Sequence, residues 1–181
     1  MTDLVLTLIG NDRPGLVEAV AGIVAGHNGN WLESRMTHLA GKFAGILRAE
    51  LPPEKVAAAL EALVGLEARG LRVVAETVPR AGGAGGAGSG APRTMELELV
   101  GLDRPGIVRE IAQLLAQNGV NVEELATDRH SAPMSGEMLF EAHARVQVPS
   151  SADVVSLRVA LERLASDLMV EVTLNEPPPG R

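Results

Sequence analysis

Hydrophobic and polar positions follow the same order twice along this chain. In the first half, apolar residues alternate over residues 4–9 as in a strand, and then recur at helical spacing over residues 16–24. Two strand-like segments follow at 30–39 and 43–51, separated by Gly41. Apolar spacing after Pro53 predicts a second helix, and residues 71–78 predict a final strand.

The second half repeats this order. Strands are predicted at 95–100, 121–129, 138–148 and 168–174, and helices are predicted to begin at Gly106 and Ala152. Each half therefore has the order β-α-β-β-α-β of a ferredoxin-like domain. Because right-handed crossovers place both helices on one face of each sheet, we predict an α+β protein with two antiparallel sheets.

The segment 138–148 shows how a strand would be divided between two faces. Its even positions, from Met138 to Val148, are apolar or small and are expected to face the helices. Glu141, His143 and Arg145 then point away from the helices. The outer sheet face is therefore predicted to be polar and open to solvent or a partner.

A run of Ala, Gly and one Ser at residues 81–91 marks the clearest boundary. Such a sequence is typical of a flexible linker, and it lacks the Lys-Ser/Thr ending of a phosphate-binding loop. We predict a first domain at 1–79, a linker at 80–92 and a second domain at 93–176. The Pro-rich residues 177–181 are predicted to form a disordered tail, with docking through an extended Pro-rich segment as an alternative.

Composition excludes several classes of function. The net charge of −7 disfavours direct binding to nucleic acid or another polyanion. The absence of cysteine excludes disulfides, thiolate catalysis and cysteine-based metal sites, and we expect neither a metal nor another cofactor. The apolar run at residues 4–9 is too short for a signal peptide or a membrane span, so we expect a cytoplasmic protein without membrane attachment.

The hexapeptide GNDRPG at residues 10–15 recurs as GLDRPG at residues 101–106. Asp12 and Asp103 are candidates to cap the first turn of the following helix, with Pro14 and its repeat at the helix opening. Capping alone requires neither the arginine nor the glycine. The glycine permits close backbone approach, the N–H groups of a helix start suit a carboxylate, and the aspartate attracts an ammonium. A small zwitterion would satisfy both groups.

This loop, the helix and the following NGN or NGxN segment together resemble the ACT domain, a ferredoxin-like module that commonly binds amino acids for regulation. The tandem arrangement is similar to that of the glycine cleavage system transcriptional repressor group, particularly through NDRPGLVEAVAGIV and NWLESRM. The resemblance implies ligand-binding positions near the first loop, at an interface with another ACT domain, and equivalent positions in the repeat. These positions are Asn11, Asp12, Gly15, Leu16 and Asn30, repeated as Leu102, Asp103, Gly106, Ile107 and Asn121. Since Leu102 replaces the polar Asn11, the second loop is expected to bind a ligand less well.

The resemblance implies an amino-acid-sensing regulatory protein without enzymatic activity. We expect glycine or serine as ligand, a second regulatory protein or an enzyme as partner, and a homodimer formed through open sheet edges. Regulation of glycine cleavage would then be indirect, through a DNA-binding partner.

Two alternatives stay open from the sequence. One is a constitutive interaction module whose loops only shape the chain. The other is a small ferredoxin-like phosphatase of the acylphosphatase type using Arg13 or Arg104, although the aspartate beside each arginine would repel phosphate. The four histidines lack metal-ligand spacing, and the near absence of aromatic residues excludes a base-stacking RNA surface.

Overall fold

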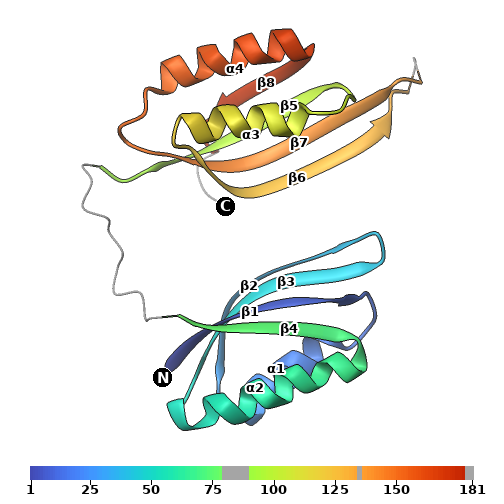
Figure 1. Ribbon diagram of the computed structural model, residues 1–181, viewed down its shortest axis with the longest axis vertical. Coiled ribbons are helices and arrows are strands. Elements are labelled where there is room, and N and C mark those ends of the chain that lie inside the picture. Colours follow the sequence, from blue (N-terminus) through green and yellow to red (C-terminus); the bar gives the residue numbers. More distant parts are fainter. Residues whose placement is uncertain (79–89, 134–135, 178–181) are drawn as a thin grey trace. The chain divides into compact units, whose positions relative to one another are not determined.

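The chain divides into two compact units, Met1–Ala84 (unit 1) and Gly85–Arg181 (unit 2). A computed structural model describes residues 1–78, 90–133 and 136–177 of the chain (Figure 1). Most of the predicted linker, residues 80–89, and the tail residues 178–181 lie outside the described residues.

Unit 1 contains one four-stranded antiparallel sheet with strand order β2-β3-β1-β4. Two helices and two short 3-10 helices connect the strands. Their bounds are β1 Thr2–Asn11, α1 Leu16–Gly26, β2 Asn30–Leu39, β3 Lys42–Leu51, η1 Pro53–Lys55, α2 Val56–Val64, η2 Gly65–Arg69 and β4 Leu71–Val78.

Unit 2 repeats this architecture with strand order β6-β7-β5-β8. Its elements are β5 Arg93–Leu102, α3 Ile107–Gln117, β6 Asn121–Ser131, β7 Met138–Val148, α4 Val154–Leu168 and β8 Val170–Asn175. The predicted α+β fold with two β-α-β-β-α-β halves is confirmed.

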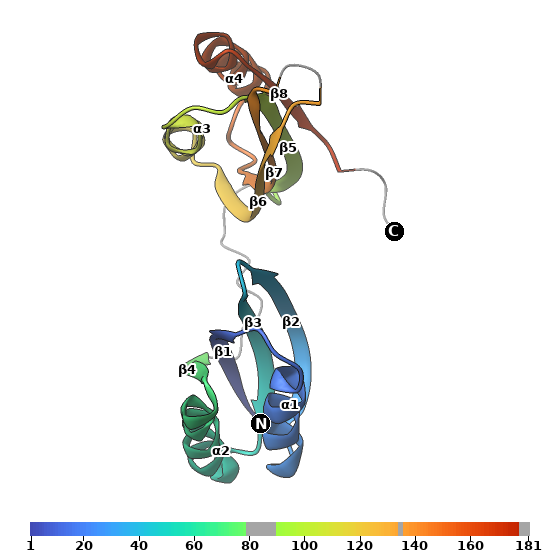
Figure 2. The ribbon, with the colours of Figure 1, turned by 90° about the vertical axis from the view of Figure 1, so that its right-hand side faces the viewer.

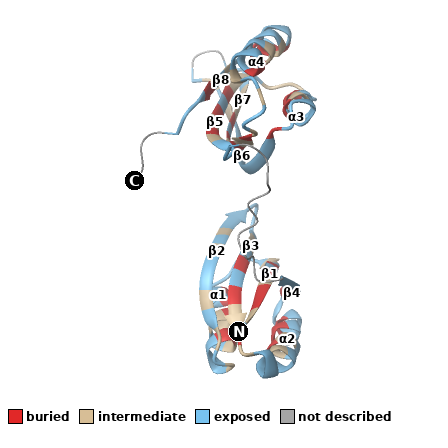
Figure 3. Cartoon of the chain, turned by 90° about the vertical axis from the view of Figure 1, so that its left-hand side faces the viewer, coloured by how far each residue is buried: buried red, intermediate tan, exposed pale blue. Residues whose placement is uncertain are grey.

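In both units the two helices cover one face of the sheet (Figures 1 and 2). Burial is concentrated between the helices and the sheet in each unit (Figure 3). In unit 1, Leu4, Leu6 and Leu8 are at most 1 % exposed and face the buried positions of the helices, such as Val20 and Leu63. Alternate strand positions remain on the outer face, which follows from the two-residue period of a strand.

Two expectations about individual elements were wrong. Leu168 is the last residue of α4 and not the start of a strand, because Met169 takes a left-handed conformation that ends the helix. Met138 is more than one-third exposed at the start of β7, whereas Ala142, Ala144 and Val146 are buried as predicted.

The first glycine of each repeated hexapeptide permits a close contact between strands. A Cβ atom on Gly10 would lie 2.5 Å from the carbonyl oxygen of Gly70, next to the start of β4. A Cβ atom on Gly101 would lie 2.5 Å from Cγ1 of Val170 at the start of β8. Only glycine fits these positions without a shift of the neighbouring strand.

No helix among the described residues combines the length and the apolar character needed to cross a bilayer.

Candidate functional site

Each repeated loop connects the first strand of its unit to the first helix. Gly15 and Gly106 occupy the N-cap positions of α1 and α3 with φ angles of 88° and 100°. These left-handed conformations favour glycine, which explains why the motif ends with this residue. The following residues, Leu16 and Ile107, are buried and anchor the helix starts in the two cores.

The predicted capping by aspartate was wrong in both units. Neither α1 nor α3 has a side-chain cap at its N-terminus, because the aspartate lies three residues before the N-cap glycine. Pro14 and Pro105 likewise precede the cap and do not occupy the first helical turn. Helix N–H groups of the first turn therefore lack a capping side chain in both loops.

In the first loop the carboxylate of Asp12 has no hydrogen bond or ion pair with any described residue. Its backbone N–H donates to the carbonyl of Gly41 at 2.9 Å, which fixes the loop against the β2–β3 turn. The backbone of Asp12 is thus fixed, whereas its exposed carboxylate has no cationic partner among the described residues. This arrangement can receive a ligand amine.

The neighbours of Asp12 are engaged elsewhere. The carboxamide oxygen of Asn11 accepts from Nζ of Lys42 at 2.6 Å, across the β1–β3 pair. The guanidinium of Arg13 donates to the backbone carbonyl of Arg69 at the end of η2. Because this arginine secures the loop to η2, its phosphate-binding use in the phosphatase alternative loses support.

In the second loop the aspartate has an internal partner. Nε of Arg129, on β6, lies 2.7 Å from Oδ2 of Asp103. The backbone N–H of Asp103 donates to the carbonyl of Met138 at 2.8 Å. The two loops therefore share their backbone frame and differ in the charge that faces the aspartate.

Asn30 and Asn121 lie at the other end of their sheets from these loops. Along β3, Asn11 pairs with Lys42 whereas Asn30 pairs with Glu50, eight residues further. At about 3.3 Å per residue this separation is about 26 Å. Asn121 has the corresponding place in unit 2. In each unit, four of the five predicted positions lie together in the repeated loop and at the start of the following helix. The fifth position, Asn30 or Asn121, lies at the opposite end of the sheet.

A small crevice lies next to the first loop, between the start of α1 and η2. Its volume is about 10 Å³, which is room for about one water molecule. The carboxylate of Glu18 also lies near this helix start, since its Oε2 is 3.8 Å from the position of a Cβ on Gly15. An amino acid bound at Asp12 would therefore need a second protein surface to cover it.

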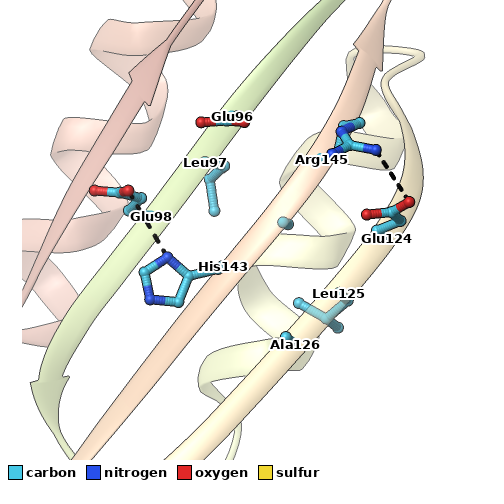
Figure 4. Close-up of a pocket in the computed structure, with 9 residues that line it drawn as sticks. Glu96, Leu97, Glu98, Glu124, Leu125, Ala126, His143 and Arg145 are labelled. Atoms are coloured by element: carbon cyan, nitrogen blue, oxygen red, sulfur yellow. Dashed lines mark hydrogen bonds and ion pairs between the residues drawn. The ribbon is translucent and has the colours of Figure 1, made fainter. Parts of the chain in front are cut away.

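A larger hollow of about 330 Å³ lies on the outer face of the unit 2 sheet (Figure 4). Arg145 lies 3.0 Å from Glu124 there, and the imidazole of His143 lies 3.8 Å from Glu98. The surrounding face is strongly acidic. Its carboxylates belong to Glu96, Glu98, Glu123, Glu124, Asp128, Glu141 and Glu171. Among the residues that the structure describes, no three His, Asp or Glu side chains are placed so that they could hold a metal ion together.

The sequence interpretation missed Lys42 and Arg129. Both come from strands that are distant in sequence from the loops, so only the strand register places them there. The repeat offers one signal for Arg129, because the position 91 residues earlier is His38, which carries no permanent charge.

Comparison with known proteins identifies the module. Residues 2–74 and residues 89–166 each match a family model described as ACT domain. The glycine cleavage system transcriptional repressor of Escherichia coli is 24 % identical over 176 residues, which cover 95 % of this chain and 88 % of that protein. A UPF0237 protein of Methanococcus maripaludis is 37 % identical over 79 residues, or 43 % of this chain and 81 % of that protein.

Among solved structures, a protein of Galdieria sulphuraria described as an unknown protein matches nearly the full length of this chain. It superposes with a TM-score of 0.82 and is 29 % identical, covering 98 % of this chain and 99 % of the other.

Proposed function

Because both halves of this chain belong to the ACT domain family, we propose that the protein is a regulator that senses a small amino acid through its first loop. The observation that carries the proposal is the carboxylate of Asp12, which is exposed and unpaired among the described residues and lies just before an uncapped helix start. A ligand ammonium would pair with this carboxylate. The ligand carboxylate would bind the N–H groups near Gly15 and Leu16.

Glu18 limits how the ligand carboxylate can bind. Because its own carboxylate already lies near Gly15, a second carboxylate would have to displace it. Glycine or serine suits such a site, since neither adds bulk or charge beyond the zwitterion. The small size of the crevice supports a site completed by a further protein surface, contributed by a second copy or a partner.

The ligand proposal is tested by a thermal-shift screen of the common amino acids on the full chain. A ligand at about 100 times its Kd raises the free energy of unfolding by about 2.7 kcal/mol, which appears as a higher Tm. Asp12→Ala should abolish this rise. Because Asp12 caps no helix, the variant should otherwise stay within about 0.5 kcal/mol of the wild type.

Asp103→Ala serves as the matched control, since it removes the equivalent aspartate of unit 2 and should retain most of the ligand response. No Tm change with any amino acid, or equal responses in wild type and Asp12→Ala, would favour the constitutive interaction module instead.

The E. coli relative supports a role in transcriptional repression of glycine cleavage. We propose that such regulation is indirect and that this chain itself performs no catalytic step. Its charge of −7 opposes contact with DNA phosphates, so a DNA-binding protein partner is required. A gel shift by the purified protein alone, with sequence preference at about 150 mM salt, would contradict indirect action.

We further propose a homodimer. In each sheet the two outermost strands, β2 and β4 or β6 and β8, have one unpaired edge among the described residues. Pairing of such an edge with a second copy would satisfy its backbone groups. Light scattering at micromolar concentration should give twice 18.9 kDa, and a mass of 18.9 kDa alone would count against the dimer.

A further inference from the structure

The two repeated loops differ in the side chain that faces their aspartate. Arg129 pairs with Phe140 in the sheet register of unit 2, and His38 pairs with Phe43 at the equivalent place in unit 1. The edge strands β2 and β6 also carry register shifts at equivalent places, after Trp31 and after Val122. His38 and Arg129 therefore occupy equivalent positions in the two sheets. The aspartate of unit 2 therefore faces a permanent cation, whereas the aspartate of unit 1 does not.

The ion pair in unit 2 partly covers its carboxylate. The Asp103 side chain is 25 % exposed, while Arg129, which covers it, is 62 % exposed. A guanidinium supplies a positive charge and N–H donors to a carboxylate, which are the properties that an ammonium would supply. A ligand amine would therefore compete with Arg129 for Asp103.

We propose that Arg129 is a built-in substitute for the ligand ammonium, so that amino-acid sensing is confined to the first loop. This assignment rests on the proposed function of the first loop. In unit 1, His38 is shorter and lacks a permanent charge, and it makes no contact with Asp12 that qualifies as an ion pair among the described residues. The side chain at this strand position decides whether a loop of this protein binds a ligand.

The assignment is tested by exchanging the two side chains in the full-length chain. Backbone amide NMR spectra are recorded during titration with glycine, L-alanine and L-serine. In the wild type, the signals of Gly15 and Leu16 should shift while those of Gly106 and Ile107 do not. His38→Arg should raise the dissociation constant at the first loop by about fivefold, the upper range for one exposed ion pair.

Arg129→Gln should make the amides of Gly106 and Ile107 respond to the ligand, because it removes the competing cation. In Arg129→Lys the amides of Gly106 and Ile107 should still not respond to the ligand. The neutral His38→Gln should leave the dissociation constant at the first loop unchanged. Spectra without ligand establish that every variant is folded.

Equal shifts in both loops of the wild type would overturn the assignment while leaving amino-acid binding intact. The assignment is likewise overturned, with amino-acid binding intact, if the first loop responds but the amides of Gly106 and Ile107 do not shift in Arg129→Gln. If no amino acid shifts either loop in the wild type or in Arg129→Gln, both the assignment and the proposed sensing function are wrong.

Discussion

At the scale of single residues, left-handed backbone positions determine where strands and helices end. The β2–β3 hairpin turns through Ala40 and Gly41, with φ angles of 49° and 74°. Two positive φ angles in a two-residue loop are typical of a type I′ turn, which prefers Asn-Gly. Alanine at the first position is therefore strained by its Cβ atom.

Ala40→Asn should relieve this strain and raise the free energy of unfolding by about 0.5–1 kcal/mol, since asparagine tolerates the left-handed region. Urea denaturation followed by the fluorescence of Trp31, the single tryptophan, measures the change in unit 1. Gly41→Ala is the opposing control and should destabilise. A lower stability of Ala40→Asn would show that the turn is not strained at this position.

One helix has an aspartate cap, and it is not in the repeated loops. Oδ1 of Asp153 accepts from the backbone N–H of Val155 at 3.0 Å, and Oδ2 accepts from Oγ of Ser156 at 2.6 Å. The hydrogen bond from Ser156, followed by that from Val155, lowers the pKa of Asp153. The ionised carboxylate is thus favoured in the folded state.

This lowered pKa gives the cap a definite pH dependence. Its contribution to stability is fully present above the unfolded-state pKa of about 3.9 and is lost as the pH falls through the lower folded-state pKa. Asp153→Asn keeps a capping oxygen but cannot titrate, so it should lose less stability than the wild type between about pH 5 and pH 2. Thermal unfolding monitored by circular dichroism measures both proteins, and parallel pH profiles would contradict the role of the carboxylate.

At the scale of elements, periodicity predicted nearly the whole fold. The bounds of β2, β4 and β7 agree with the predicted segments. Of these three strands, only β7 has a regularly buried face, at Ala142, Ala144, Val146 and Val148. The starts of α3 and α4 were misjudged by one and two residues, and η2 was missed. Short 3-10 turns have no hydrophobic period that a sequence reveals.

The candidate site was less predictable than the fold. The sequence made Asp12 and Gly15 candidates, because the hexapeptide recurs in a fixed place before a helix. It could not show that Asn30 lies at the far end of the sheet or that Arg129 reaches Asp103. Those relations depend on pairing between strands distant in sequence.

The close contact at Gly10 yields a prediction for the packing of β1 against β4. Gly10→Ala places a Cβ atom 2.5 Å from the Gly70 carbonyl, and it should destabilise unit 1 by about 1–3 kcal/mol. Gly22→Ala is the control, because a Cβ there meets nothing within 4 Å and alanine favours the helix by about 0.8–1 kcal/mol. Trp31 fluorescence should report a lower Tm for the first variant and a higher Tm for the second. Equal effects would contradict the proposed close contact.

At the scale of the whole molecule, charge is divided unevenly between the repeats. Residues 1–78 contain nine carboxylates and seven cationic side chains, whereas residues 90–177 contain fourteen and seven. The formal charges are thus −2 and −7. Half of the carboxylates of unit 2 lie on its outer sheet face, where Arg145 is the only arginine or lysine among the described residues that faces them.

Mutual repulsion across this face should lower the stability of unit 2 at low ionic strength. Glu171 lies beside a hollow of about 280 Å³ that Glu98 and Glu141 also line, so Glu171→Gln removes one charge from a group of like charges. We expect the variant to be more stable by up to about 0.5 kcal/mol at low salt. Because the Debye length falls to about 3 Å at 1 M salt, the difference should vanish there.

Glu76→Gln on the outer face of unit 1, where cations and carboxylates are nearly balanced, should show no such salt-dependent gain. Urea denaturation monitored by circular dichroism at both salt concentrations measures these differences. A gain for Glu171→Gln that persists in high salt would show that packing, and not charge repulsion, limits the stability of this sheet.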